Sequence, residues 1–254
     1  MFGCWNAGRS CLPHQACLLH NFGSGGGRLN MRHFLDLTNR KPIFYGSNRV
    51  VYVHPEDPDF FVKVARPRAV KNYLDRIPKW KRRFKILGGG LPQSFREFRE
   101  YMRLNLPAAP VLPYIFVSAG FVATSEGWGH VVKAERGEDG NYAPTLASII
   151  NEPGKYEKPL ADFLSWVVDT PAAFTNLQPW NLVLAQRDGK NQIVSIDGLG
   201  ERCFIQFRAY FPSINKRKNR RRVRKLLWRI EELKAGRIGV EAQEKMKGTV
   251  ASTV

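Results

Sequence analysis

The sequence predicts a mixed α+β domain, and three observations support that prediction. Short runs rich in β-branched and aromatic residues recur in the first half of the chain, separated by turns of Gly, Pro and Asn. Apolar residues recur at helical spacing in several segments, most of them in the second half. Two more apolar runs, 182–184 and 192–196, flank Asp188-Gly189, a dipeptide typical of a tight β-hairpin.

The composition allows one sizeable domain or two small ones. The chain has 254 residues, and 43% of them are hydrophobic, which is ordinary for a soluble globular protein. Its 40 Lys and Arg residues outnumber 22 Asp and Glu residues, so that the formal net charge is +18. Such a surface attracts polyanions, whether nucleotide phosphates, nucleic acid or anionic lipid. The four cysteines form no disulfide framework, which favours a reducing, cytoplasmic environment.

Residues 1–30 are expected to be a disordered extension outside the domain. They contain no apolar run long enough for a secretory signal or a membrane span, and they end near a glycine-rich stretch. Met31 follows directly, so either Met1 or Met31 is the true start. Cysteine and histidine side chains in this segment could in principle hold zinc, although their spacing matches no common zinc finger. These residues are Cys4, Cys11, His14, Cys17 and His20.

Five strands are predicted before residue 136. The first three are short and separated by turns at 46–49 and 55–58, so they form a three-stranded meander. Two longer apolar runs, joined at Glu126-Gly127, complete a five-stranded sheet. The five runs are 43–45, 50–54, 60–64, 112–123 and 128–135.

Lys63 is unexpected in the third strand, where the neighbours Val62 and Val64 are apolar. A lysine in such a strand either meets an anion or lies on a solvated face of the sheet. The sequence leaves both alternatives open.

Three further segments have helical character before the last helix. Ser94 begins a helix and Glu97 follows three residues later, as in a capping box. Apolar residues recur at helical spacing in 146–150 and 158–169, and both segments are expected to be core.

Two segments are strongly basic. Residues 215–233 are predicted to form a helix with nine Lys or Arg residues between Lys216 and Arg229 and an apolar stripe. This helix is either an arm that binds a polyanion or protein partner or an ordinary solvated amphipathic helix. Residues 66–85 carry nine more basic residues with interleaved aromatics, and form either a nucleic-acid face or a solvated helix.

Two polar side chains flank the predicted hairpin. Asn181 lies just before its first strand and Asp197 just after its second, so pairing of the strands brings them to the same edge. An amide oxygen and a carboxylate that converge there are suitable ligands for a hard cation such as Mg²⁺.

This arrangement resembles the catalytic and metal-binding loops of protein-kinase-like folds. The matching residues are Asn-Leu-Gln-Pro-Trp-Asn at 176–181 and Asp-Gly-Leu-Gly at 197–200. Together with Tyr-Val-His-Pro-Glu-Asp at 52–57 and Val-Lys-Val at 62–64, their order resembles the PhoP-regulatory-network YrbL family over roughly residues 40–235.

The resemblance implies a two-lobed, protein-kinase-like fold for residues 40–235. The five-stranded sheet and one helix would form an N-lobe over about 40–134, and a truncated helical C-lobe would follow over about 135–235. Residues 236–254 would be a flexible tail.

The resemblance also implies ATP and Mg²⁺ as cofactors and assigns roles to individual residues. Lys63 would pair with the phosphates and with a helix glutamate, which is Glu97 or, in reserve, Glu100. Asn181 and Asp197 would hold the metal. The remaining nucleotide-binding positions would be Gly46, Ser47, Asn48 and Arg49 in the first turn and Val132 and Ala134 in the connection between lobes.

Catalysis is left open because Asn176 stands where kinases have the catalytic Asp, and an amide accepts no proton near pH 7. We therefore expect an ATP- and Mg²⁺-binding, kinase-like regulatory protein that is a weak or atypical kinase, or a pseudokinase. The alternative is a basic nucleic-acid or membrane-surface adaptor that keeps a kinase-like scaffold without nucleotide.

Overall fold

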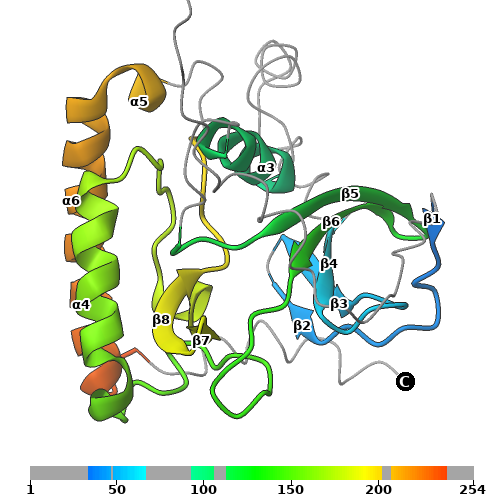
Figure 1. Ribbon diagram of the computed structural model, residues 1–254, viewed down its shortest axis with the longest axis horizontal. Coiled ribbons are helices and arrows are strands. Elements are labelled where there is room, and N and C mark those ends of the chain that lie inside the picture. The colour runs from blue at the N-terminus through cyan, green and yellow to red at the C-terminus, as the bar shows by residue number, and fades with distance from the viewer. Residues whose placement is uncertain (1–33, 47, 67–92, 106–112, 202–206, 239–254) are drawn as a thin grey trace, which may run out of the picture. The chain divides into compact units, whose positions relative to one another are not determined.

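The computed structural model describes residues 34–46, 48–66, 93–105, 113–201 and 207–238, all of which belong to a unit that spans residues 33–254 (Figure 1). Several predictions fall outside the described residues. These are the extension at 1–30 with its zinc candidates, Ser47, all but Arg66 of the basic segment 66–85, and the tail from residue 239.

A six-stranded sheet forms the first layer. Its order is β1-β5-β6-β4-β3-β2, and only the β1–β5 pair is parallel. The strands are β1 (Phe34–Leu35), β2 (Phe44–Tyr45), β3 (Arg49–Val53), β4 (Phe60–Ala65), β5 (Ser118–Thr124) and β6 (Gly127–Lys133). The prediction of five strands was therefore wrong by one: β1 was missed, since two residues are too few to show an alternating pattern.

Strand β4 is buried on both faces of the sheet. On one face, Val62 and Val64 of β4 pack with Leu35, Leu37 and Tyr52 in a small apolar cluster. Since side chains alternate along a strand, Phe61 and Lys63 point to the other face. Phe61 packs there against the main apolar core, and Lys63 is also buried.

Helix α3 (Gln93–Leu104) packs against β4 and β5. Phe95 and Phe98 both contact the ring of Phe121 in β5, with ring centroids 4.5 and 5.2 Å apart. These aromatic contacts fix the helix on the sheet, so that its buried carboxylates, Glu97 and Glu100, face the interior.

The chain then forms a two-stranded hairpin and two long helices. The elements are α4 (Pro153–Asp169), the 3₁₀ turn η1 (Pro179–Asn181), β7 (Leu182–Arg187), β8 (Lys190–Ser195), α5 (Phe207–Tyr210) and α6 (Pro212–Lys234). Helices α4 and α6 pack side by side (Figure 1). The predicted hairpin is confirmed: Asp188 and Gly189 have φ values of 52° and 71°, as the tight turn requires.

Two local predictions were wrong. Residues 146–150 form turns instead of a helix, because the Leu146 N–H is donated to the Leu182 carbonyl at 2.8 Å and Thr145 bridges to Val183. This segment therefore lies along the hairpin. The strand predicted from residue 112 begins only at Ser118, and Ile115 instead bridges to Ser195 of β8.

One main core connects the sheet with the C-terminal elements. Phe116 and Val132 from the sheet side are buried against three residues from the C-terminal elements. These are Phe163 of α4, Leu226 of α6 and Phe174, which lies in the loop after α4. In the described part of the chain, no helix is long and apolar enough to cross a membrane.

Candidate functional site

A cavity of about 540 Å³ lies between the six-stranded sheet and the β7–β8 hairpin. It gathers most of the residues to which the sequence assigned a role. The side facing the sheet is lined by Ile43, Phe44, Gly46, Asn48, Arg49, Val51, Phe61, Lys63, Phe116, Val132, Lys133 and Glu135. The other lining residues are Gln93, Tyr142, Ala143, Thr145, Asn176, Gln178, Trp180, Asn181, Val183, Ile196 and Asp197.

Lys63 is buried at the wall of this cavity, with only 6% of its surface exposed. Its ammonium donates a hydrogen bond to the Ile196 carbonyl at 2.7 Å and lies 5.2 Å from the centroid of the Phe116 ring. These contacts exclude the alternative that the Lys63 side chain lies on a solvated face of the sheet. Burial, reinforced by the positive charge of Arg49, lowers the pKa of Lys63 to about 8.

Arg49 is the main cation of the site. Its guanidinium contacts Glu97 with Nη1 at 2.7 Å and Nη2 at 3.2 Å, and Nη2 lies 2.5 Å from Oδ2 of Asp197. Arg49 thus joins a carboxylate of α3 to the carboxylate that follows β8. The expected pair between Lys63 and Glu97 is not formed, because Arg49 occupies the carboxylate.

The two carboxylates differ in their environment. Glu97 is fully buried, and this burial raises its pKa to about 7, although Arg49 acts in the opposite direction. Burial also acts to raise the pKa of Asp197, but the Arg49 guanidinium outweighs it and holds that pKa well below the usual range. At neutral pH, Asp197 therefore carries the full negative charge that faces Arg49 and Lys63.

Further hydrogen bonds hold Glu97 in place. Its Oε1 accepts the Gln93 side-chain amide at 3.0 Å and the Gly198 N–H at 3.2 Å. The predicted capping box is not what these side chains form: α3 begins at Gln93, and the Ser94 hydroxyl accepts from Arg49 at 3.4 Å. Within the first turn of its own helix, the Glu97 carboxylate thus accepts a hydrogen bond from the Gln93 side chain.

Glu100, the reserve candidate, faces a different part of the molecule. It pairs with Arg103 at 2.6 Å and accepts the Ala173 N–H at 2.9 Å. It therefore positions the loop that leads to Asn176 and makes no contact with Lys63.

Asn181 and Asp197 lie at the same end of the β7–β8 hairpin, as the strand pairing predicts. Leu182 pairs with Ser195, and the Ile196 N–H is donated to the Asn181 carbonyl at 3.0 Å. The described residues contain no cluster of three or more His, Cys, Asp or Glu side chains that could hold a metal. A cation bound by Asn181 and Asp197 would thus need oxygen ligands from elsewhere, such as phosphates.

Asn176 is held against the turn after β8. The Thr175 N–H and hydroxyl both donate to the Gly198 carbonyl, at 2.8 and 3.0 Å. Gly198 has φ of +85°, and a Cβ added there would lie 2.5 Å from the Asn176 carbonyl oxygen. The Asn176 side-chain oxygen accepts the amide of Gln178. Only glycine fits this turn, and its tight contact fixes Asn176 beside Asp197.

The turn between β2 and β3 is closed by its own backbone. The Gly46 N–H is donated to the Arg49 carbonyl at 2.8 Å, and the Arg66 guanidinium donates to the Gly46 carbonyl at 3.2 Å. Gly46 and Asn48 line the cavity, but this arrangement commits the Gly46 amide within the hairpin.

The end of β6 and the residues that follow it contribute unequally to the cavity. Val132 lines the cavity, whereas Ala134 is buried away from its lining and donates its N–H to the Asp59 carbonyl at 2.7 Å. Glu135 is mostly buried and forms an ion pair with Arg187 of β7. This pair was not predicted, since no sequence pattern relates residues 52 positions apart.

A buried polar network, which was not predicted from the sequence, anchors the loop before Asn176. Asn215 and Asn219 of α6 donate to the carbonyls of Val167, Thr170 and Ala172 at 2.9 to 3.3 Å. Arg208 of α5 donates to the Phe174 carbonyl at 2.8 Å. The available signal was a pair of asparagines four residues apart on the apolar side of the basic helix.

Comparison with protein families agrees with the resemblance found in the sequence. No curated protein matches the chain. The sequence model of one family, described as PhoP regulatory network protein YrbL, matches residues 35–231, and this range contains the cavity and the residues that line it. The chain therefore belongs to the YrbL family of PhoP regulatory network proteins.

Proposed function

We propose that the chain is a kinase-like regulatory protein that binds ATP with Mg²⁺ in the cavity between the sheet and the β7–β8 hairpin. The observation that supports it is the gathering of Lys63, Asn176, Asn181 and Asp197 around one cavity. Lys63 is more than a hundred positions from the other three residues, and the four match the phosphate-binding, catalytic and metal positions of a kinase-like site.

The size and lining of the cavity suit a nucleotide. A volume of about 540 Å³ is within the range of small-molecule sites. Val51 and Phe61 of the sheet and Val183 of the hairpin offer apolar surfaces on opposite sides, as a purine ring requires. Lys63 and Arg49 then supply positive charge for the phosphates.

Metal binding requires a rearrangement of Arg49. Its guanidinium is 2.5 Å from Asp197 and neutralises the carboxylate that would bind Mg²⁺. A bound Mg²⁺ would replace Arg49 as the cation beside Asp197, and Arg49 would be released toward the phosphates. Nucleotide and metal should therefore bind together, since each favours the other's charge arrangement.

Catalysis in this proposal is weak. Asn176 offers an amide where general-base catalysis needs a carboxylate, and general-base assistance is typically worth about 10² to 10⁴ in rate. Asn176 can still orient a hydroxyl by hydrogen bonding. We therefore infer slow phosphotransfer or a purely regulatory binding role.

The alternative is a basic adaptor that binds nucleic acid or a membrane surface without nucleotide. The net charge of +18 and the cations of α6 favour it. It gives no reason for a buried lysine and the Asp197 carboxylate at one cavity.

A thermal-shift titration tests nucleotide binding. ATP at about a hundred times its dissociation constant should add about 2.7 kcal/mol to the free energy of unfolding when Mg²⁺ is present. Asp197→Ala should remove the dependence on Mg²⁺, whereas Asp162→Ala, a carboxylate exposed on α4, should not. Each variant is compared with its own ligand-free form. An unmoved melting temperature with millimolar ATP and Mg²⁺ would show that the cavity is no nucleotide site.

A further inference from the structure

Helix α6 presents an unusual surface on the side that faces away from the core. Its buried residues are Asn215, Asn219, Leu226, Ile230 and Leu233, which fall on one side at helical spacing. The opposite side carries Arg217, Arg221, Arg224 and Trp228, all exposed. We call the exposed set the α6 basic face, and it consists of Phe211, Ile214, Arg217, Arg221, Arg224 and Trp228.

The cations of this face are not neutralised. Between Pro212 and Ile230 the helix contains no Asp or Glu. Among the described residues, no carboxylate forms an ion pair with Arg217, Arg221 or Arg224. They therefore concentrate positive charge along the helix.

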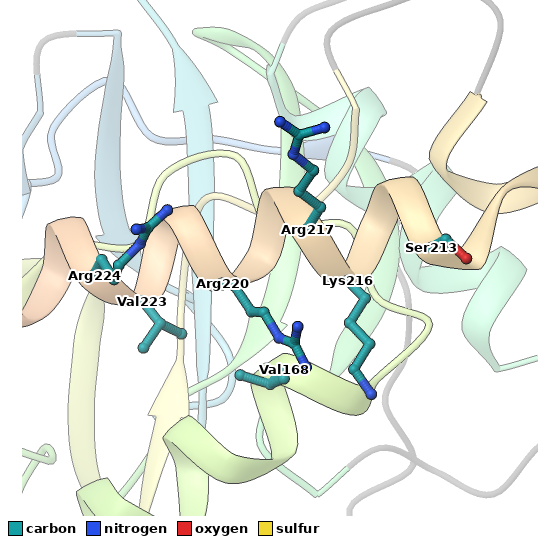
Figure 2. A pocket seen from close by; sticks show the side chains of 7 residues that line it. All are labelled: Val168, Ser213, Lys216, Arg217, Arg220, Val223 and Arg224. Carbon is teal, nitrogen blue, oxygen red and sulfur yellow. The ribbon is translucent and has the colours of Figure 1, made fainter.

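The positive charge continues into a hollow of about 640 Å³ beside α4. Figure 2 shows Lys216, Arg220 and Val223 extending from α6 toward the side of Val168, while Arg217 extends the opposite way. Lys216 pairs there with Asp169 of α4 at 2.5 Å. Cations thus lie on both sides of the exposed ridge. Among the described residues, Asp169 pairs with Lys216, and Glu201 pairs with Lys218 at 3.5 Å.

Large apolar side chains interrupt these cations. Tyr210 and Phe211 are 76% and 51% exposed where α6 begins, and Trp228 is 55% exposed further along. Ile214 and Leu227 are each 42% exposed. Water-exposed apolar groups gathered at the start of α6 and along it mark an interaction surface, since a solvated helix gains nothing from them.

We infer that the α6 basic face docks on an anionic lipid bilayer. Arginines attract the negative surface, and the apolar and aromatic side chains enter the boundary between headgroups and acyl chains. Trp and Tyr favour this boundary because they combine an apolar ring with a polar tip. A helix of 23 residues, about 34 Å long, can lie along such a surface.

A bilayer accounts for the surface better than a nucleic acid does. Phosphates of a duplex would satisfy the arginines, but they would leave Ile214 in water. This aliphatic side chain has no ring on which a base could stack. Docking on a bilayer buries the charges and the apolar groups together. This inference is independent of nucleotide binding, because none of the α6 basic face lines the cavity.

Co-sedimentation of the full chain with vesicles tests the inference. Vesicles of phosphatidylcholine alone are compared with vesicles that also contain phosphatidylserine. The chain should bind only the anionic vesicles. Arg217→Gln, Arg221→Gln and Arg224→Gln together should weaken binding on the order of 100-fold, since each basic residue near an anionic bilayer contributes about a factor of five.

A charge-matched control separates this face from the overall charge. Arg40→Gln, Lys158→Gln and Lys190→Gln together remove the same three charges from other exposed positions. This variant should bind anionic vesicles within a few-fold of the unaltered protein. Equal losses in both triple variants would overturn the inference, as would no binding to anionic vesicles.

Ile214→Ser distinguishes a bilayer from a nucleic acid. It should weaken vesicle binding and leave any binding of duplex DNA or single-stranded RNA unchanged. The melting temperature and circular dichroism of each variant verify that it is folded. Tight binding of nucleic acid with no binding of vesicles would assign this face to the nucleic acid instead.

Discussion

Replacing Arg49 by Met should destabilise the protein strongly, and more so as the pH rises. Arg49 is 7% exposed and contacts Glu97, which is fully buried, and Asp197, of whose side chain 23% is exposed. Removing one partner of a buried ion pair typically costs about 3 to 5 kcal/mol, because the remaining charge loses its compensation. Lys63 stays nearby, so we expect about 3 kcal/mol at pH 7.

The pH dependence follows from Glu97. Its pKa is about 7 in the folded protein and 4.5 as a free side chain, so the folded state binds the extra proton. The contribution of Glu97 to the free energy of unfolding is therefore fully present below pH 4.5 and falls as the pH rises from 4.5 to 7. Without Arg49 the pKa of Glu97 rises further, and this window extends above pH 7. The destabilisation should grow by up to ~1.4 kcal/mol per pH unit above neutrality.

Urea denaturation, followed by tryptophan fluorescence at pH 6, 7 and 8, measures these values. The double variant Arg49→Met with Glu97→Gln should recover part of the loss, because it removes the uncompensated carboxylate. Arg136→Met is the matched control, since it breaks an exposed pair with Asp59 and should cost less than about 1 kcal/mol. A pH-independent loss for Arg49→Met, or one no larger than the control, would refute the assigned role of Arg49.

Two further predictions concern the loops at the cavity. Gly198→Ala should cost about 2 to 4 kcal/mol, because its Cβ would lie 2.5 Å from the Asn176 carbonyl oxygen, whereas Gly189→Ala, with positive φ but open space, should cost about 1 kcal/mol in the same denaturation assay. Equal costs would show that the turn has room to relax. Asn176→Asp should raise ATP hydrolysis under saturating Mg²⁺ by about 10² to 10⁴ if the rest of the site is competent, since it restores a general base of the same size. Rapid hydrolysis by the unaltered protein would instead mean that another group acts as the base.

Local patterns were sufficient to find the hairpin and the residues at its ends. Asp188-Gly189 and the apolar runs beside it predict the pairing of β7 with β8, and this pairing alone brings Asn181 to the residues after Ser195. Strand alternation likewise identified Lys63 as a lysine in an apolar setting. Such features depend on neighbours in the sequence, and the sequence therefore shows them directly.

Partners far apart in the sequence could not be chosen in this way. The family resemblance suggested that Glu97 would pair with Lys63. In the folded chain, Glu97 instead pairs with Arg49, 48 positions away, and the Lys63 ammonium donates to a backbone carbonyl. A bidentate guanidinium satisfies both oxygens of a buried carboxylate better than a single ammonium does. Whether Arg49 or Lys63 pairs with Glu97 depends on how α3 packs against the sheet.

In the basic helix α6 too, the sequence determined some features and the tertiary structure determined others. Its charge and its apolar stripe could be read from the sequence, and they define α6 and the arginines that face water. That Asn215 and Asn219 hold the loop before Asn176 was decided by tertiary structure, because an asparagine becomes an anchor only where unpaired backbone carbonyls lie within hydrogen-bonding distance. The sequence thus determined which chemical groups are available, and the packing of distant segments determined which of them meet.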